Sequence, residues 1–122
     1  ETIIGSRILN ASGASVTAST TENQAMTVIE ALCPSLPVVC ADVPNMTAIV
    51  GKDMGWFFKA HDLDDLASTM IKALTDGTRD EKAHNAYLSR ERYDGRNVAL
   101  SFIEIYKELL QRKKDGWRPK DW

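Results

Sequence analysis

The pattern of apolar and polar residues is clearest between residues 19 and 41. A polar turn at residues 19–24 leads into apolar positions at helical spacing, namely Ala25, Val28, Ile29 and Leu32. This spacing predicts a helix over residues 25–33. Pro34 stops the helix, and the Val-rich run after it predicts a strand over residues 37–41. We therefore expect a turn–helix–strand unit in this part of the chain.

The remaining chain repeats this change between strand and helix patterns. Further strands are expected at residues 14–18 and 55–59. Helices are expected at residues 3–11, ended by Gly13, at 46–50, ended by Gly51, at 63–75, at 80–92, and from residue 95 onward. Residues 42–45 are expected to form a loop. Asp62 and Asp94 are the expected N-caps of the helices that follow them, and Gly77 is the expected end of the helix at 63–75. Two apolar stripes accompany the later helices: Leu63, Leu66, Met70, Ala73 and Leu74 in the first, and Val98, Phe102, Ile105, Tyr106 and Leu109 in the second.

The alternation of strands and helices predicts an α/β fold with a parallel sheet of about three strands covered by helices. Ligands of such sheets bind beside the carboxyl ends of the strands. Three segments are therefore expected on one functional rim: residues 19–27, 42–46 and 59–62.

Composition narrows the class of protein. The chain has 122 residues, which is the size of one domain, and its net charge of −2 gives no nucleic-acid footprint. No apolar run approaches the roughly 18 residues of a membrane span. Cys33 and Cys40 lie in apolar stretches and are expected to be buried, reduced thiols, which favours a reducing, cytoplasmic compartment.

The helix expected at residues 25–33, together with the turn before it, carries the candidate catalytic and binding residues. Backbone N–H groups at residues 23–27 would lie at the positive end of the helix, where phosphate binds well. Glu22 lies at this helix mouth, but Ser19 and Glu22 also match the S-x-x-E pattern of a capping box. Glu30 lies two turns further along, either facing solvent or held by a partner.

These residues resemble a known motif. The pattern Ser-x-x-Glu-(x7)-Glu-Ala-Leu followed by Leu-Pro-Val-Val is similar to the Glu-x7-Glu motif of glycosyltransferase family 4, whose members have the GT-B architecture of two facing Rossmann-like domains. The resemblance runs from about residue 7 to residue 106. It includes Gly55-Trp56-Phe57-Phe58, the capped helix at residues 62–67 and the helix at residues 98–106. It implies a partial Rossmann-like domain, the C-terminal half of a GT-B donor domain.

The resemblance also implies roles for individual residues. Glu22 corresponds to the catalytic glutamate beside the donor sugar, and Glu30 to the glutamate that accepts both ribose hydroxyls. The diphosphate would bind at Asn23, Gln24, Ala25, Met26 and Thr27. The implied reaction is a metal-independent, retaining transfer of a hexose from a nucleotide-diphosphate sugar to an acceptor, with a lipid among the candidates.

Two departures from the family pattern bear on this reading. The family usually has Gly where this chain has Ala25, and Ala-x-Gly where this chain has Pro34-Ser35. Ala25 is small enough to leave phosphate binding intact. Pro34 is expected to force a different helix ending, since proline restricts the residue before it.

The resemblance covers less than a whole enzyme, so the chain is expected to be a fragment whose partner is a missing N-terminal acceptor domain. Residues 1–110 would form the C-terminal portion of the nucleotide-sugar-binding domain and residues 111–122 a basic, Trp-containing tail. The fragment alone is expected to be inactive and to self-associate through an open sheet edge. The tail is solvated, contacts an anionic membrane peripherally through Trp117 and Trp122, or packs on the missing domain.

Two alternative functions stay open. The chain is part of a GT-B relative resembling a nucleotide-sugar epimerase, or it is a binding module without catalysis.

Overall fold

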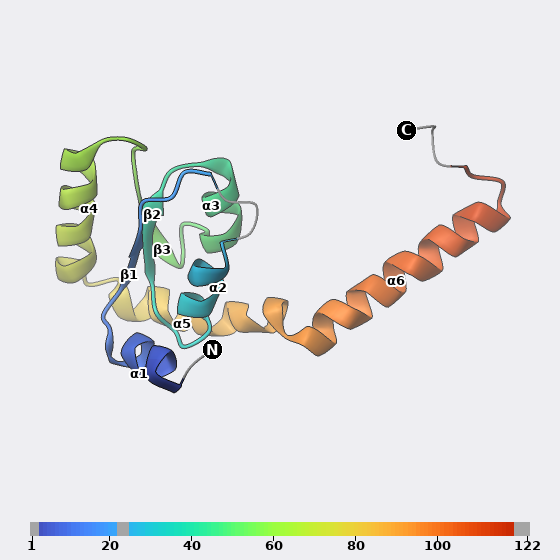
Figure 1. Cartoon of the computed structure of the whole chain (residues 1–122), viewed down its shortest axis with the longest axis horizontal. Helices are drawn as coiled ribbons and strands as arrows, with labels where there is room; N and C mark the ends of the chain where they lie inside the picture. Colours follow the sequence, from blue (N-terminus) through green and yellow to red (C-terminus); the bar gives the residue numbers. More distant parts are fainter. Residues whose placement is uncertain (1–2, 22–24, 119–122) are drawn as a thin grey trace. The chain divides into compact units, whose positions relative to one another are not determined.

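The structure is a computed structural model that describes residues 3–21 and 25–118. Two compact units divide the chain, Glu1–Arg90 and Glu91–Trp122, and each is described by itself. Within the described residues, the elements of the first unit are α1 (Ile3–Ala11), β1 (Ser15–Thr17), α2 (Met26–Leu32), β2 (Val38–Ala41), α3 (Pro44–Val50), β3 (Gly55–Phe58), α4 (Leu63–Thr75) and α5 (Arg79–Ser89) (Figure 1). A short 3-10 helix, η1 (Arg90–Tyr93), precedes α6 (Gly95–Lys114).

The three described strands form one parallel sheet in the order β1-β2-β3. Val39 of β2 lies opposite Val16 of β1 and Trp56 of β3 in the register. Helices α2 and α3 cover one face of the sheet and α4 covers the other (Figure 1). The predicted α/β class, with a parallel sheet covered by helices, is therefore confirmed.

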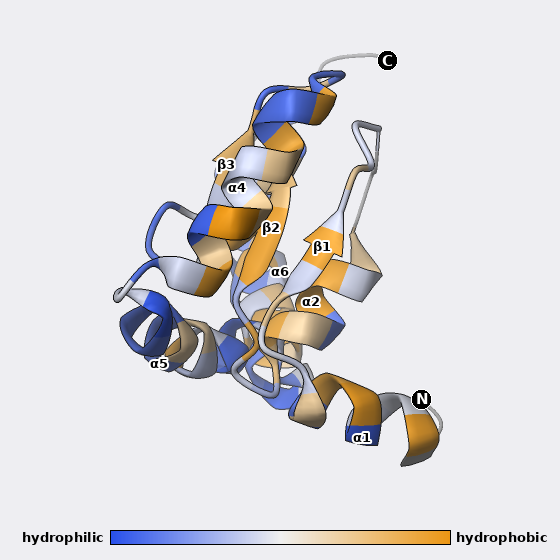
Figure 2. Cartoon of the chain, turned by 90° about the vertical axis from the view of Figure 1, so that its left-hand side faces the viewer, coloured by the Kyte–Doolittle hydropathy of each residue, from blue (hydrophilic) through white to orange (hydrophobic). Residues whose placement is uncertain are grey.

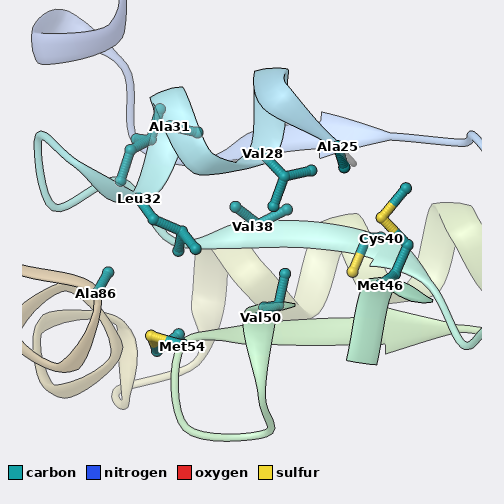
Figure 3. Packing of buried hydrophobic residues seen from close by; sticks show 11 residues of the cluster. Ala25, Val28, Ala31, Leu32, Val38, Cys40, Met46, Val50, Met54 and Ala86 are labelled. Atoms are coloured by element: carbon teal, nitrogen blue, oxygen red, sulfur yellow. The ribbon is translucent and has the colours of Figure 1, made fainter. Parts of the chain in front are cut away.

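Strand β2 is the centre of the core, because all four of its residues are buried. Val38 and Cys40 pack with residues of α2 and α3, as Figure 3 shows. Val39 and Ala41 alternate to the other face and pack with residues of β3 and α4. Burial on both faces explains the continuous apolar run, which is typical of an inner parallel strand. Figure 2 shows this hydrophobic character along β2.

Ser35 ends α2 in a way that the sequence did not lead us to expect. Its φ of 69° lies in the left-handed region that favours glycine. Its N–H donates to the Leu32 carbonyl at 3.0 Å, and the Leu36 N–H donates to the Ala31 carbonyl at 3.1 Å. These are the two hydrogen bonds of a Schellman motif. The expectation of a different helix ending was therefore wrong, because a serine here adopts the conformation that a glycine provides without strain.

Replacing Ser35 with glycine should therefore stabilise the protein. A left-handed conformation costs an L-residue about 1–2 kcal/mol, part of which the more flexible unfolded chain of the glycine variant offsets. We expect a gain of about 1 kcal/mol in the free energy of unfolding, measured by urea titration. A loss of stability in Ser35→Gly would show that the serine side chain contributes more than its backbone costs.

Several predicted boundaries need correction. Helix α3 begins at Pro44, inside the expected loop, because proline is well suited to the first helical turn. Helix α4 spans Leu63–Thr75 as expected, but its C-cap is Asp76 rather than Gly77. The apolar stripe of α4 is only partly used, since Leu63 and Leu74 are 79% and 77% exposed while Ala73 is buried. The helix expected at residues 80–92 ends at Ser89 and continues as η1.

Aspartate caps were predicted correctly. The Asp62 carboxylate accepts a hydrogen bond from the Asp65 N–H at 3.0 Å. The Asp94 carboxylate accepts from the Arg96 and Asn97 N–H groups at 2.9 and 3.3 Å. Each contact satisfies a donor that the helix itself leaves unpaired, so both helices begin where the sequence indicates.

The second unit consists mainly of α6, whose apolar residues are exposed within that unit. The helix continues to Lys114, so the first four residues of the expected tail at 111–122 are helical. The division of the chain at residue 110 stays a prediction. Among the described residues, no helix is both long enough and apolar enough to cross a membrane.

Candidate functional site

The carboxyl ends of the three strands lie at one rim because the strands are parallel. Strands β1, β2 and β3 end at this rim with Thr17, Ala41 and Phe58, and each strand is followed along the chain by a helix. The amino ends of α2, α3 and α4 therefore lie at the rim, which is the place where ligands of open α/β sheets bind.

The amino end of α2 presents backbone donors at this rim. Ala25 is the N-cap residue, and its carbonyl accepts hydrogen bonds from the Val28 and Ile29 N–H groups at 3.0 and 3.1 Å. Met26 and Thr27 are exposed, and the N–H groups of these two residues have no acceptor among the described residues. They are the first donors of the helix and are suited to an anionic group.

The Ala25 side chain does not obstruct this end of the helix. It is 2% exposed and belongs to the core cluster with Val28 and Leu32, as Figure 3 shows. The methyl group that this chain has in place of the family's glycine is therefore directed into the core. It leaves the adjoining backbone donors accessible.

Glu30 lies one turn inside α2. Its neighbours Ile29 and Ala31 are buried, whereas Glu30 itself is half-buried. Its Cα lies about 6 Å along the helix axis from that of Met26, from four rises of ~1.5 Å. Within the described ranges, 3–21 and 25–118, no hydrogen bond or ion pair to its carboxylate is found. A carboxylate that is half out of water without a protein partner has acceptor capacity left for a ligand.

The remaining predicted site residues, Glu22, Asn23 and Gln24, lie outside the described residues. Helix α2 begins at Met26, with Ala25 as its N-cap. The two roles considered for Glu22, a contact to the donor sugar and a capping box with Ser19, both stay predictions.

The sequence did not indicate a second feature, an open hollow of about 850 Å3 along β3. On its wall the Trp56 indole N–H donates to the Asp76 carboxylate at 3.0 Å, and the Lys82 ammonium lies 5.3 Å from the centre of the Trp56 ring. The hydrogen bonds from Trp56 and Thr78 lower the pKa of Asp76, since both favour the ionised carboxylate. Residues twenty positions apart meet here, which no local pattern shows.

The two cysteines differ in environment. Cys33 is exposed, so the expectation that it is buried was wrong, whereas Cys40 is fully buried in β2. Burial, together with the nearby negative charge of Asp42, raises the pKa of the Cys40 thiol to about 12. Cys40 is therefore an unreactive core residue.

Within the described part of the chain, no three His, Cys, Asp or Glu side chains gather as a metal site would require.

Comparisons with known proteins bear on the family and the fold of this chain. A family model described as "Glycosyl transferases group 1" matches residues 6–90. The structure is similar to that of sucrose-phosphate synthase from Thermosynechococcus elongatus, with a TM-score of 0.74 and 20% sequence identity. The similarity covers 85% of this chain and 27% of that one, so the chain spans about a quarter of the length of this structural relative. No curated protein sequence matches the chain. The family match covers more than half of the sequence, and the chain belongs to the group 1 glycosyltransferase family.

Proposed function

We propose that this chain is the donor-binding part of a retaining hexosyltransferase of glycosyltransferase family 4. The enzyme would transfer a hexose from a nucleotide-diphosphate sugar to an acceptor hydroxyl. Family membership supports the reaction class. The observation that carries the donor site is Glu30, a half-buried carboxylate that has no partner among the described residues and lies one turn from the exposed start of α2.

In this proposal the diphosphate binds at the amino end of α2. The N–H groups of Met26 and Thr27 point toward the ligand, and Asn23, Gln24 and Ala25 complete the binding turn. The bond between the sugar carbon and the diphosphate oxygen breaks with its electron pair on that oxygen. Donors held in place before the reaction stabilise this growing negative charge more than they stabilise the bound substrate. The protein can supply this stabilisation through its own backbone.

The two glutamates would act on different parts of the donor. Glu30 accepts hydrogen bonds from both ribose hydroxyls, because a carboxylate offers two acceptor oxygens to a vicinal diol. Glu22 lies beside the transferred sugar and stabilises its reacting face. The acceptor oxygen then bonds to the sugar carbon on the face that the diphosphate leaves, and the acceptor proton passes to the departing phosphate oxygen.

Calorimetric titration of the purified chain with nucleoside diphosphates tests the proposal. A panel of uridine, guanosine and adenosine diphosphates should give saturable binding for at least one base. The matching nucleoside without phosphates should bind more weakly, because it lacks the group that the helix end holds. The proposal fails if no diphosphate in the panel binds, or if the unphosphorylated nucleoside binds equally well.

A further inference from the structure

Strand β3 forms one edge of the three-stranded sheet, and its backbone shows which residues face outward. The Val38 N–H donates to the Met54 carbonyl at 3.3 Å, and the Asp42 N–H donates to the Phe58 carbonyl at 2.8 Å. Backbone groups in a parallel strand alternate between its two sides. The even-numbered residues of β3 therefore bond to β2, and the N–H and C=O groups of Phe57 point away from the sheet.

The end of this edge is already protected. The Lys59 N–H, which also points outward, donates to the Asp65 carboxylate at 2.6 Å. Gly55, at the start of the strand, is buried, whereas Phe57 is half-buried. No hydrogen-bond partner for the Phe57 backbone is found among the described residues outside the strand. The edge is therefore open at its middle, where an incoming strand can bond.

The hollow of about 850 Å3 runs along this edge and has opposite charges at its two ends. Residues of α3 and α4 line the hollow. These two helices lie on opposite faces of the sheet (Figure 1). Asp42 and Asp65 line the end near the carboxyl terminus of β3. The other end carries Lys52, Lys72 and Lys82, with Asp76 held by the Trp56 indole. One end is thus acidic and the other has a net positive charge.

We propose that this groove binds the β3 edge of a second copy of the chain, in antiparallel orientation. A two-fold axis perpendicular to the sheet would pair Phe57 with its counterpart through two backbone hydrogen bonds. The same axis reverses the strand, so the acidic end of each groove meets the basic end of the other. On the α3 face Asp42 approaches the Lys52 of the second copy, and on the α4 face Asp65 approaches its Lys72.

The arrangement of charges along the groove favours an antiparallel second copy over other ligands. A parallel strand of a second copy would place like charges together, which costs several kcal/mol in interfaces. A small anion would meet the carboxylates at one end of the groove, and a small cation would meet the lysines at the other. Only an occupant with the reversed charge order satisfies both ends at once, and the antiparallel copy has that order by symmetry.

Sedimentation equilibrium of the whole chain tests the proposal with two charge-reversal variants. The unmodified chain should dimerise reversibly with concentration. Lys52→Glu places Glu beside Asp42 of the second copy, and Asp42→Lys places Lys beside its Lys52. Each variant alone should therefore associate at least about tenfold more weakly. An equimolar mixture of the two, and the doubly substituted chain, should both regain association because opposite charges face each other again.

Arg7→Glu on α1 is the matched control, since it makes the same change of charge at an exposed residue of the same unit, outside the groove, and should leave association unchanged. Circular dichroism of every variant shows whether the fold is retained. A chain that stays monomeric at millimolar concentration would overturn the proposal. So would a dimer that both single variants retain, which would place the contact at another surface, or a mixture that fails to regain association. None of these results depends on nucleotide binding, so the proposed function stands or falls separately.

Discussion

Gly55→Ala should destabilise the protein by at least about 3 kcal/mol, which is the upper range for overpacking a core. A Cβ atom at this position would lie 2.7 Å from the Val50 Cγ1 and closer still to the Val38 carbonyl oxygen. The carbonyl belongs to the backbone of the central strand and cannot rotate away as a side chain can. The glycine is therefore required by the close packing of β2, β3 and α3, and not by its φ angle.

Urea unfolding followed by circular dichroism measures this effect. Gly77→Ala is the matched control, because nothing lies within 4 Å of a Cβ placed there. Its effect should lie between zero and a gain of about 1 kcal/mol, from the reduced freedom of the unfolded chain. Equal stabilities for the two variants would show that the strands can move apart to accept the methyl group, contrary to the packing described above.

Glu30→Ala should weaken the binding of a nucleoside diphosphate by about 1.5–3 kcal/mol, or roughly 10- to 150-fold. The expected loss follows from removing a charged acceptor that we propose binds both ribose hydroxyls. Calorimetry of the variant and the unmodified chain measures the two affinities. Glu81→Ala on α5 is a suitable control, since Glu81 is also a helical glutamate but is exposed and lies away from the rim. Equal affinities of Glu30→Ala and the unmodified chain would remove Glu30 from the site.

Glu22→Gln should affect a different step. In the longer transferase of which we propose this chain is a part, it should lower kcat more than it weakens nucleotide affinity, because its partner is the reacting sugar. If Glu22 instead forms a capping box with Ser19, this change should be nearly silent, because glutamine also serves in such a box. Wild-type turnover in the variant would exclude a catalytic role for Glu22.

The sequence predicted the order of the elements well because each depends on local chemistry. The Val-rich run at β2 marks burial on both faces, and Asp62 and Asp94 mark helix starts through bonds to residues two or three positions away. The helix boundaries that were missed have local causes too. Pro44 begins α3 because proline is favoured in a first helical turn, and Ser35 takes a conformation that serine rarely adopts.

Features that depend on distant residues could not be predicted. The hollow along β3 is formed by α3, α4 and α5, and its contact between Trp56 and Asp76 joins two elements. The exposure of Leu63 and Leu74 likewise depends on what α4 packs against, which helical periodicity does not specify. For the donor site, the sequence identified the helix and its family motif. The structure added that Ala25 packs inward.

The most direct test of the donor site is a titration of the isotopically labelled chain with the nucleoside diphosphate that binds best, followed by amide NMR. The account predicts that the largest shift changes fall on the amides of Ala25, Met26 and Thr27 and on Glu30, with smaller changes at the other strand ends of the same rim. The amides in the middle of the β3 groove and at its basic end, such as Phe57 and Lys52, should not shift at nucleotide concentrations that saturate the site. Saturable changes confined to the β3 groove or to α6, with none at the start of α2, would contradict the account.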